Sequence, residues 1–237
     1  MNSTMFLTVC SFFYSVLLLF LIFFKKKKKI NDSERKIYNI LVISNFLGIL
    51  IELLCVITCR NYKRIPIING VVLRLYLIYL LTWIITFTRY IFSISMNKNS
   101  KKYCKLQKIF NIFILILYVV ISILIFILPI KYHVENNMVM YIYGSSTNML
   151  YMFVEAFVIL CLILMFSNPK NIKGTKYAPL FIFIAGGAAI MVIQSINPSW
   201  LLMTSMETFI TFLMYFTIES EDSIKSNDNE EITNNKN

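Results

Sequence analysis

The chain contains seven apolar runs of roughly 20 residues each, separated by short polar segments. A helix of about 20 apolar residues crosses a hydrocarbon core of about 30 Å, because each residue adds about 1.5 Å of rise. The runs cover residues 5–24, 37–59, 69–94, 109–128, 142–166, 177–196 and 200–218. We therefore expect an all-α integral membrane bundle of seven transmembrane helices over residues 1–219. Residues 220–237 are acidic and rich in asparagine, which predicts a disordered cytoplasmic tail.

Basic residues gather in the loops on one side of the predicted bundle. The loops 25–36, 96–108 and 167–176 hold 15 Lys and Arg residues, against four in the segments on the other side. Those four are Arg60, Lys63, Arg64 and Lys131. Short cytoplasmic loops are enriched in Lys and Arg, so this asymmetry predicts an N-terminus outside, a C-terminus inside and a location in the plasma membrane. The same placement explains the net charge of +11 without a nucleic-acid partner.

The first apolar run does not have the order of a cleaved signal peptide. Its basic residues, Lys25 to Lys29, follow the run, whereas a signal peptide carries its positive charge before the apolar region. We therefore expect this run to remain as the first helix.

Residue types that carry catalysis are sparse. The one histidine, His133, lies in the predicted outer loop between helices four and five. Cys55 and Cys59 share a helical face, but they have no His or Cys partner nearby that would complete a metal site. The sequence has no zinc-protease motif, nucleophile elbow or glycine-rich phosphate loop. It therefore predicts no enzyme, with no catalytic residues, no cofactor and no metal.

Charged residues inside the predicted spans are the strongest functional signal. Such residues cost about 2.5–3.5 kcal/mol each at the bilayer centre. Arg89 lies close to the cytoplasmic surface and can extend its side chain to it. By helical rise, Glu52, Arg74 and Glu207 lie roughly 7–12 Å, and Glu155 about 15 Å, below the outer boundary. These four could converge on one polar site in the outer half of the bundle.

The charges of this candidate site do not balance. Arg74 is the natural ion-pair partner of Glu52 or Glu207, because pairing lowers the cost of burial. One arginine cannot neutralise three carboxylates, so at least one is left protonated, exposed to water or available to a cationic ligand. A structural network that only holds helices together is an equal alternative. Further polar residues that could line the region are Tyr76, Tyr79, Gln194, Ser195 and Asn197.

The sequence Gly-Gly-Ala-Ala at 186–189 is a patch of small residues within the sixth predicted helix. In lipid, such a patch lets another helix approach closely. We expect it to be a packing face.

Several stretches resemble the multi-helix N-terminal sensor region of some Firmicutes-type sensor histidine kinases. They are Ser44 to Leu53, Leu75 to Trp83, and above all INPSWLLMTSMETFITFLMYFTIES at 196–220. The resemblance covers most of 37–219 and is most specific at its C-terminal end. It implies a sensor of the two-component type, with a signal exit at Thr217, Ile218 and Glu219. After Glu219 such proteins continue into a kinase core, which this sequence does not contain.

We therefore expect a signal-input module that lacks its own kinase output. Its expected partners are the bilayer, an extracellular or intramembrane ligand, and a cytoplasmic kinase or other signalling protein. The sequence leaves open whether the chain forms a homodimer. A small multi-pass transporter and a membrane scaffold are the alternatives.

Overall fold

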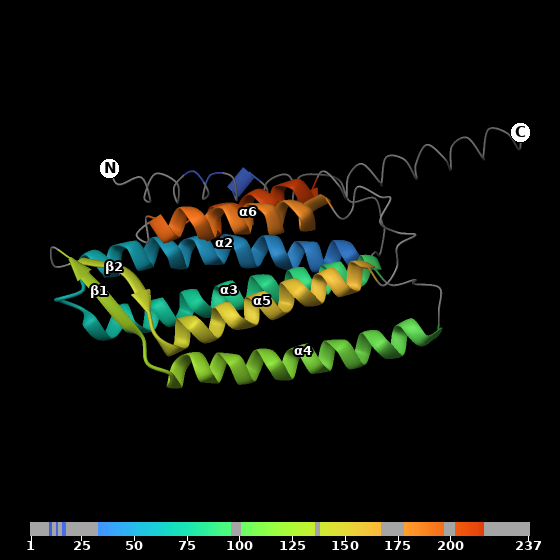
Figure 1. Ribbon diagram of the computed structural model, residues 1–237, viewed down its shortest axis with the longest axis horizontal. Coiled ribbons are helices and arrows are strands. Elements are labelled where there is room, and N and C mark those ends of the chain that lie inside the picture. The colour runs from blue at the N-terminus through green and yellow to red at the C-terminus, as the bar shows by residue number, and fades with distance from the viewer. Residues whose placement is uncertain are drawn as a thin grey trace, which may run out of the picture.

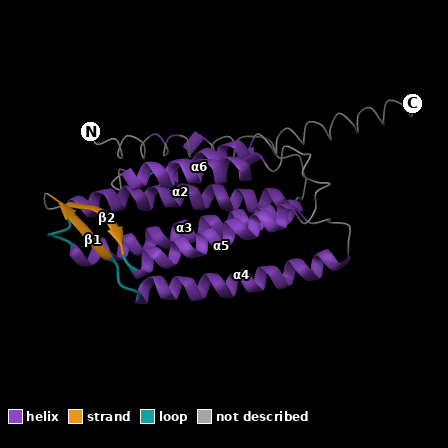
Figure 2. Ribbon diagram, in the orientation of Figure 1, coloured by secondary structure: helices purple, strands orange, loops and turns teal. Residues whose placement is uncertain are grey.

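The computed structural model describes residues 10, 13, 16–17, 33–95, 101–135, 138–166, 178–196 and 202–215. Its elements are α2 (Ser33–Arg60), α3 (Pro66–Ser95), α4 (Lys101–Ile127), β1 (Lys131–Glu135), β2 (Met138–Tyr143), α5 (Ser145–Phe166) and α6 (Ala178–Ile196). A further helical segment covers 203–215 and is called the last helix below. These helices run side by side along the long axis of the molecule, with the β-hairpin across one end (Figures 1 and 2).

Four helices are long and apolar enough to cross a membrane, namely α2 from Arg35, α3, α4 from Lys105, and α5. The chain is therefore a multi-pass membrane protein with an all-α bundle. The described residues do not show the seven spans that the sequence predicts. α6 contributes only a shorter apolar stretch, Ala178–Gly187, and the described part of the last helix is too short to cross a bilayer.

Several predicted features lie outside the described residues. They are the first predicted helix apart from four of its positions, the loop 167–176, the turn at 197–199, the signal exit at 217–219 and the tail 220–237.

α3 is the central helix of the bundle and packs against α2, α4 and α5. Its buried side chains include Trp83 and Phe87, whose rings stack with centroids 5.1 Å apart. Phe183 of α6 packs against both rings at 5.3 Å. On the other side, Phe92 stacks on Phe110 of α4 at 4.1 Å. Aromatic packing thus fixes α3 between two layers of helices.

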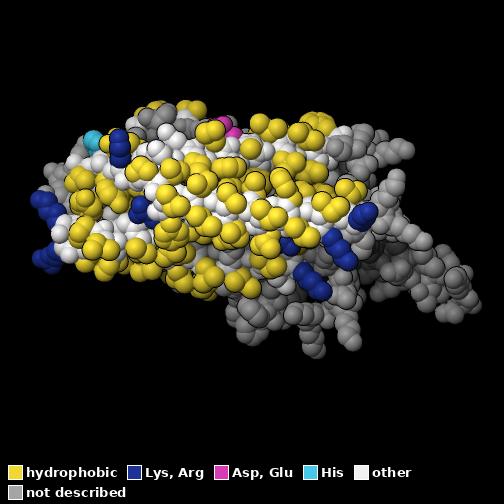
Figure 3. Space-filling model, turned by 90° about the horizontal axis from the view of Figure 1, so that it is seen from below, with side chains coloured by type: hydrophobic (Ala, Val, Ile, Leu, Met, Phe, Trp, Pro, Cys, Tyr) yellow, Lys and Arg dark blue, Asp and Glu magenta, His cyan; other side chains and the backbone are white. Residues whose placement is uncertain are grey.

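α4 and α5 keep large apolar side chains on the outside of the bundle. On α4 these include Ile112, Phe113, Leu115 and Ile116, each more than half exposed. An apolar surface of this extent would promote aggregation in water, whereas lipid chains solvate it. Figure 3 shows the apolar side chains over the middle of the described surface and Lys and Arg near its ends. This distribution is the one expected of a protein that crosses a bilayer.

The connection between α4 and α5 differs from the sequence prediction, which left it as a loop. β1 and β2 form an antiparallel hairpin, with Lys131 opposite Tyr143 and an irregularity between His133 and Val134. Gly144 ends the hairpin with a φ of 121°, a conformation that side chains disfavour. The segment is too short for a membrane helix, and its tyrosine, valine and isoleucine residues prefer strands. Both features favour a short pair of strands.

The observed helix boundaries also differ from the predicted ones. α3 begins at Pro66, whose fixed φ and missing N–H suit the first turn of a helix. α4 begins at Lys101, so much of the predicted basic loop 96–108 is helical. The apolar pattern defines only the part of a helix within the membrane, whereas the helix itself extends beyond it.

Candidate functional site

The last helix presents four polar side chains on one face. Thr204, Glu207, Thr208 and Thr211 are spaced three or four residues apart, which places them one above another on successive turns. All four are buried, with at most 2% of their surface exposed. Polar groups buried in a membrane protein need hydrogen-bond partners inside the protein. For this face the partners come from α2 and α3.

At the C-terminal part of this face the partners belong to α2. The hydroxyl of Tyr38 donates to the carbonyl of Thr211 at 3.0 Å. Two turns further along α2, Nδ2 of Asn45 donates to the hydroxyl oxygen of Thr208 at 3.1 Å. The side chains of Tyr38 and Asn45 are both buried. α2 thus holds the last helix at two separate turns.

At the N-terminal part of this face the partners belong to α3. The hydroxyl of Tyr79 donates to Oε2 of Glu207 at 2.6 Å, and Tyr76 and Thr204 share a hydrogen bond of 3.2 Å between their hydroxyl oxygens. The Tyr79 hydroxyl also lies 3.2 Å from Oδ1 of Asn45. Its single proton favours the shorter contact, whose length is that of a hydrogen bond to a charged or strongly polar acceptor.

The hydrogen bonds between the last helix and the pair α2 and α3 form one continuous row, which we call the polar ladder. Its members are Tyr38, Asn45, Tyr76, Tyr79, Thr204, Glu207, Thr208 and Thr211. The ladder connects residues that lie between 128 and 173 positions apart in the chain. It fixes both the rotation and the height of the last helix relative to α2 and α3.

Gly48 of α2 makes room for one member of the ladder. A Cβ atom built on Gly48 would overlap the ring carbon Cε2 of Tyr79. The Tyr79 ring therefore packs directly on the backbone of α2, and only glycine permits that approach. Tyr79 can reach Glu207 because this position has no side chain.

The structure brings two of the four predicted site residues together. Glu52 of α2 is fully buried, and it lies close enough to Glu207 for their charges to interact. The buried hydroxyls of Tyr76 and Tyr79 are also within electrostatic range of both glutamates. Two buried carboxyl groups within electrostatic range of each other disfavour each other's charge. The arrangement can hold a proton or a cation between α2 and the last helix, or serve only to join helices.

Arg74 lies closer to the hairpin end of the molecule. Its Nη1 donates to the carbonyl of Gly70 at 3.2 Å. The guanidinium also faces the Tyr132 hydroxyl of β1, which lies 3.3 Å from a Cβ built on Gly70. Partial burial raises the pKa of Tyr132, and the charge of Arg74 acts in the opposite direction. The described contacts of Arg74 thus join α3 to the hairpin.

Glu155 is the predicted site residue whose side chain lies on the outside of the bundle. It lies on α5, and its side chain is exposed. The depth argument placed it near the other charges, but depth does not determine which way a residue faces around the helix. Of the residues predicted to line the region, the structure bears out some. Tyr76 and Tyr79 line it, while Asn197 and the side chains of Gln194 and Ser195 lie outside the described part.

Sequence reasoning missed Tyr38, Asn45, Gly48 and the three threonines of the ladder. A signal was available, because Thr204, Thr208 and Thr211 share a helical face with Glu207. On α2, Asn45 and Glu52 are seven residues apart and therefore also on one face. Neutral polar residues that share a helical face with a buried charge are therefore candidates for the same site.

Within the described residues, no group of three or more His, Cys, Asp or Glu residues is placed to hold a metal ion. No protein-family model matches the sequence, and no curated protein matches it. The resemblance to histidine-kinase sensor regions therefore stays a prediction.

Proposed function

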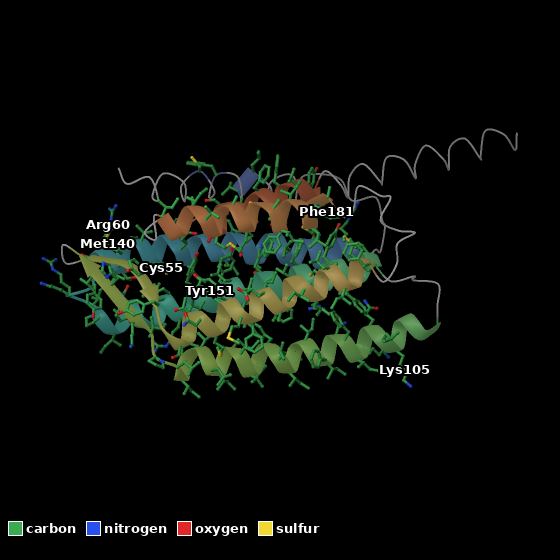
Figure 4. The ribbon with its side chains drawn as sticks, viewed as in Figure 1. Cys55, Arg60, Lys105, Met140, Tyr151 and Phe181 are labelled. Carbon is green, nitrogen blue, oxygen red and sulfur yellow. The ribbon has the colours of Figure 1, made fainter. Side chains whose placement is uncertain are left out.

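We propose that this chain is a membrane signal-input module in which the last helix carries the signal toward the cytoplasm. The proposal takes residues 1–219 as a seven-helix unit in the plasma membrane, with the N-terminus outside. The sequence supports this orientation, because 15 Lys and Arg residues fall in the predicted inner loops against four in the predicted outer segments. Figure 4 places Lys105 at the end opposite to Arg60 and Met140.

The observation that carries the proposal is the polar ladder. The last helix is hydrogen-bonded to α2 and α3 along its length, and residues 217–219 continue from its far end. A rotation or a shift of α2 or α3 would break these hydrogen bonds or move the last helix with them. Helix shifts of this kind are a common way to transmit a conformational change.

A ligand can drive such a shift only by binding two arrangements of the bundle with different affinity. The buried pair Glu52 and Glu207 lies where α2 meets the last helix, so a change in its charge or occupancy would act on the ladder directly. The ligand is an extracellular or intramembrane molecule. A cytoplasmic kinase or another signalling protein would receive the movement at Thr217, Ile218 and Glu219, and a homodimer is compatible with this arrangement.

A reporter fusion tests the proposal. The core of a histidine kinase would be joined after Glu219, and its autophosphorylation measured in membranes. Thr208→Val and Glu207→Gln each alter the ladder, and we expect each to change basal activity by up to about twentyfold. That figure assumes a hydrogen bond worth up to about 1.7 kcal/mol that exists in one state only.

Glu155→Gln is the matched control for this experiment, because it removes a carboxylate that lies outside the ladder. Its activity should equal that of the parent fusion. The proposal fails if both ladder variants, expressed and folded at parental levels, also match the parent.

A small transporter is the second candidate, favoured by the two buried carboxylates, since ionisable groups in a membrane mark ion pathways. Flux through proteoliposomes that is lost in Glu52→Gln and Glu207→Gln would establish it. A scaffold would show neither flux nor a response of the reporter.

A further inference from the structure

The hairpin end of the molecule carries a cluster of exposed basic side chains. Arg60, Lys63 and Arg64 lie at and after the end of α2, and all three are exposed. Hydrogen bonds from the amides of Arg64 and Ile65 to the carbonyl of Asn61 close the chain into a tight turn here. Three positive charges are thus held within five residues.

The hairpin adds to this cluster. The ring of Tyr62 packs against that of Tyr132 with centroids 5.4 Å apart, which brings the turn next to β1 and its exposed Lys131. His133 stacks on Tyr141 at 4.7 Å on the same hairpin. Tyrosines and basic residues are the side chains that membrane proteins place at the level of the lipid headgroups.

Acidic residues do not balance the charge. The turn and the hairpin, residues 60–70 and 129–144, contain four basic residues and one acidic residue, Glu135. Dark blue side chains at this end of the surface are visible in Figure 3. The cluster therefore attracts anions.

Directly beside the basic turn, α3 begins with an exposed apolar strip. Ile67 is 82% exposed, and Ile68, Val71 and Leu75 are between 40% and 53% exposed. A soluble anion without an apolar part would make no favourable contact with this strip. A phospholipid contacts both surfaces, since its headgroup meets the basic turn while its acyl chains lie along α3.

We propose that the turn 60–64, Lys131 and the exposed start of α3 form a binding site for an anionic phospholipid. The phosphate and any further negative charge of the headgroup pair with the basic side chains, and the acyl chains cover Ile67, Ile68 and Val71. The site holds the hairpin end at a fixed depth in the bilayer. It does not depend on the proposed signalling function.

The test compares two double variants of the full chain, each lacking two exposed basic residues. Lys63→Gln with Arg64→Gln alters the site, and Lys105→Gln with Lys108→Gln alters the exposed basic face at the start of α4, at the opposite end. Purified protein in neutral detergent is titrated with phosphatidylglycerol, with phosphatidylcholine or with inorganic phosphate. Thermal stability and bound lipid, counted by native mass spectrometry, are measured in each case.

We expect phosphatidylglycerol to stabilise the parent and the Lys105 and Lys108 variant at similar concentrations. The Lys63 and Arg64 variant should need about thirtyfold more, since each basic residue beside an anionic surface contributes about 1 kcal/mol. Equal binding by the two variants overturns the proposal, as does equal stabilisation by phosphatidylcholine. Equal stabilisation by inorganic phosphate overturns it too, because the site would then recognise a soluble anion.

Discussion

The hydroxyl of Tyr79 lies 2.6 Å from Oε2 of Glu207 and donates a hydrogen bond to it from the centre of the bundle. The two residues are 128 positions apart in the chain and belong to α3 and the last helix. Tyr79 is 4% exposed and Glu207 1%, so no water replaces this contact. The pair is the shortest of the contacts in the polar ladder, and it gives the first prediction.

Tyr79→Phe removes the donor and leaves the Glu207 carboxyl buried without it. We expect a loss of about 2 kcal/mol in the free energy of unfolding, because a buried acceptor loses a strong hydrogen bond. Tyr76→Phe, which removes a longer bond between two hydroxyls, should cost about 0.6 kcal/mol. Unfolding in mixed detergent micelles measures both. Equal losses would show that the Tyr79 bond is no stronger than that of Tyr76.

Gly48→Ala should be more damaging than Tyr79→Phe. The new methyl group would overlap the Tyr79 ring, and the buried ring cannot move aside without leaving Glu207. We expect a loss of about 3 kcal/mol, the upper end for overpacking in a core. Gly187→Ala is the control, because a Cβ built there meets nothing within 4 Å. Stability measured in the same micelles should be unchanged or slightly higher for that variant.

Gly186→Ala tests the small-residue patch on α6. A Cβ at Gly186 would meet Cε of Met206, which confirms that this position packs against the last helix. The contact is with the flexible end of a methionine, which can turn away. We expect a loss below about 1 kcal/mol, clearly smaller than for Gly48→Ala. A loss as large as that of Gly48→Ala would mean that Met206 is held in place.

Glu155→Leu should stabilise the protein. The side chain is exposed on α5, about midway along an apolar span, and a charge at such a depth costs about 2.5–3.5 kcal/mol. Thermal unfolding of the variant in bilayer nanodiscs should therefore occur at a higher temperature. A lower unfolding temperature would indicate that another chain covers Glu155, and crosslinking from this position would identify that chain.

Single cysteines report the orientation of the bundle. In a background with the native cysteines replaced by alanine, Lys63→Cys and Lys105→Cys place a thiol at exposed positions at opposite ends. A thiol reagent that cannot cross membranes should label only the Lys63 position in intact cells. Labelling of the Lys105 position from outside would invert the topology and remove the outer-facing site.

The sequence predicted the membrane class because apolar run length is a local property of the chain, and four of its seven predicted spans appear as long apolar helices among the described residues. It did not predict the hairpin at 131–143, whose strands are too short to show a clear period. Glu52 and Glu207 were identified because charge within an apolar run is conspicuous. That both are buried while Glu155 is exposed depends on the rotation of each helix, which is set by packing and not by position along the chain.

Gly48 and the ladder threonines show a further limit of sequence reasoning. The sequence shows that the threonines share a helical face with Glu207, but neither glycine nor threonine is unusual in a membrane helix, and their partners appear only once Tyr79 and the last helix are placed beside α2. Their identification required contacts between residues more than 30 positions apart.

The polar ladder also constrains how the protein is made. α2 and α3 emerge from the ribosome long before the last helix, and both carry side chains whose partners are still untranslated. During that interval Asn45 and Tyr79 must face the translocon, one another or lipid. Synthesis thus passes through an intermediate in which polar side chains of α2 and α3 are already in place while their partners on the last helix are not.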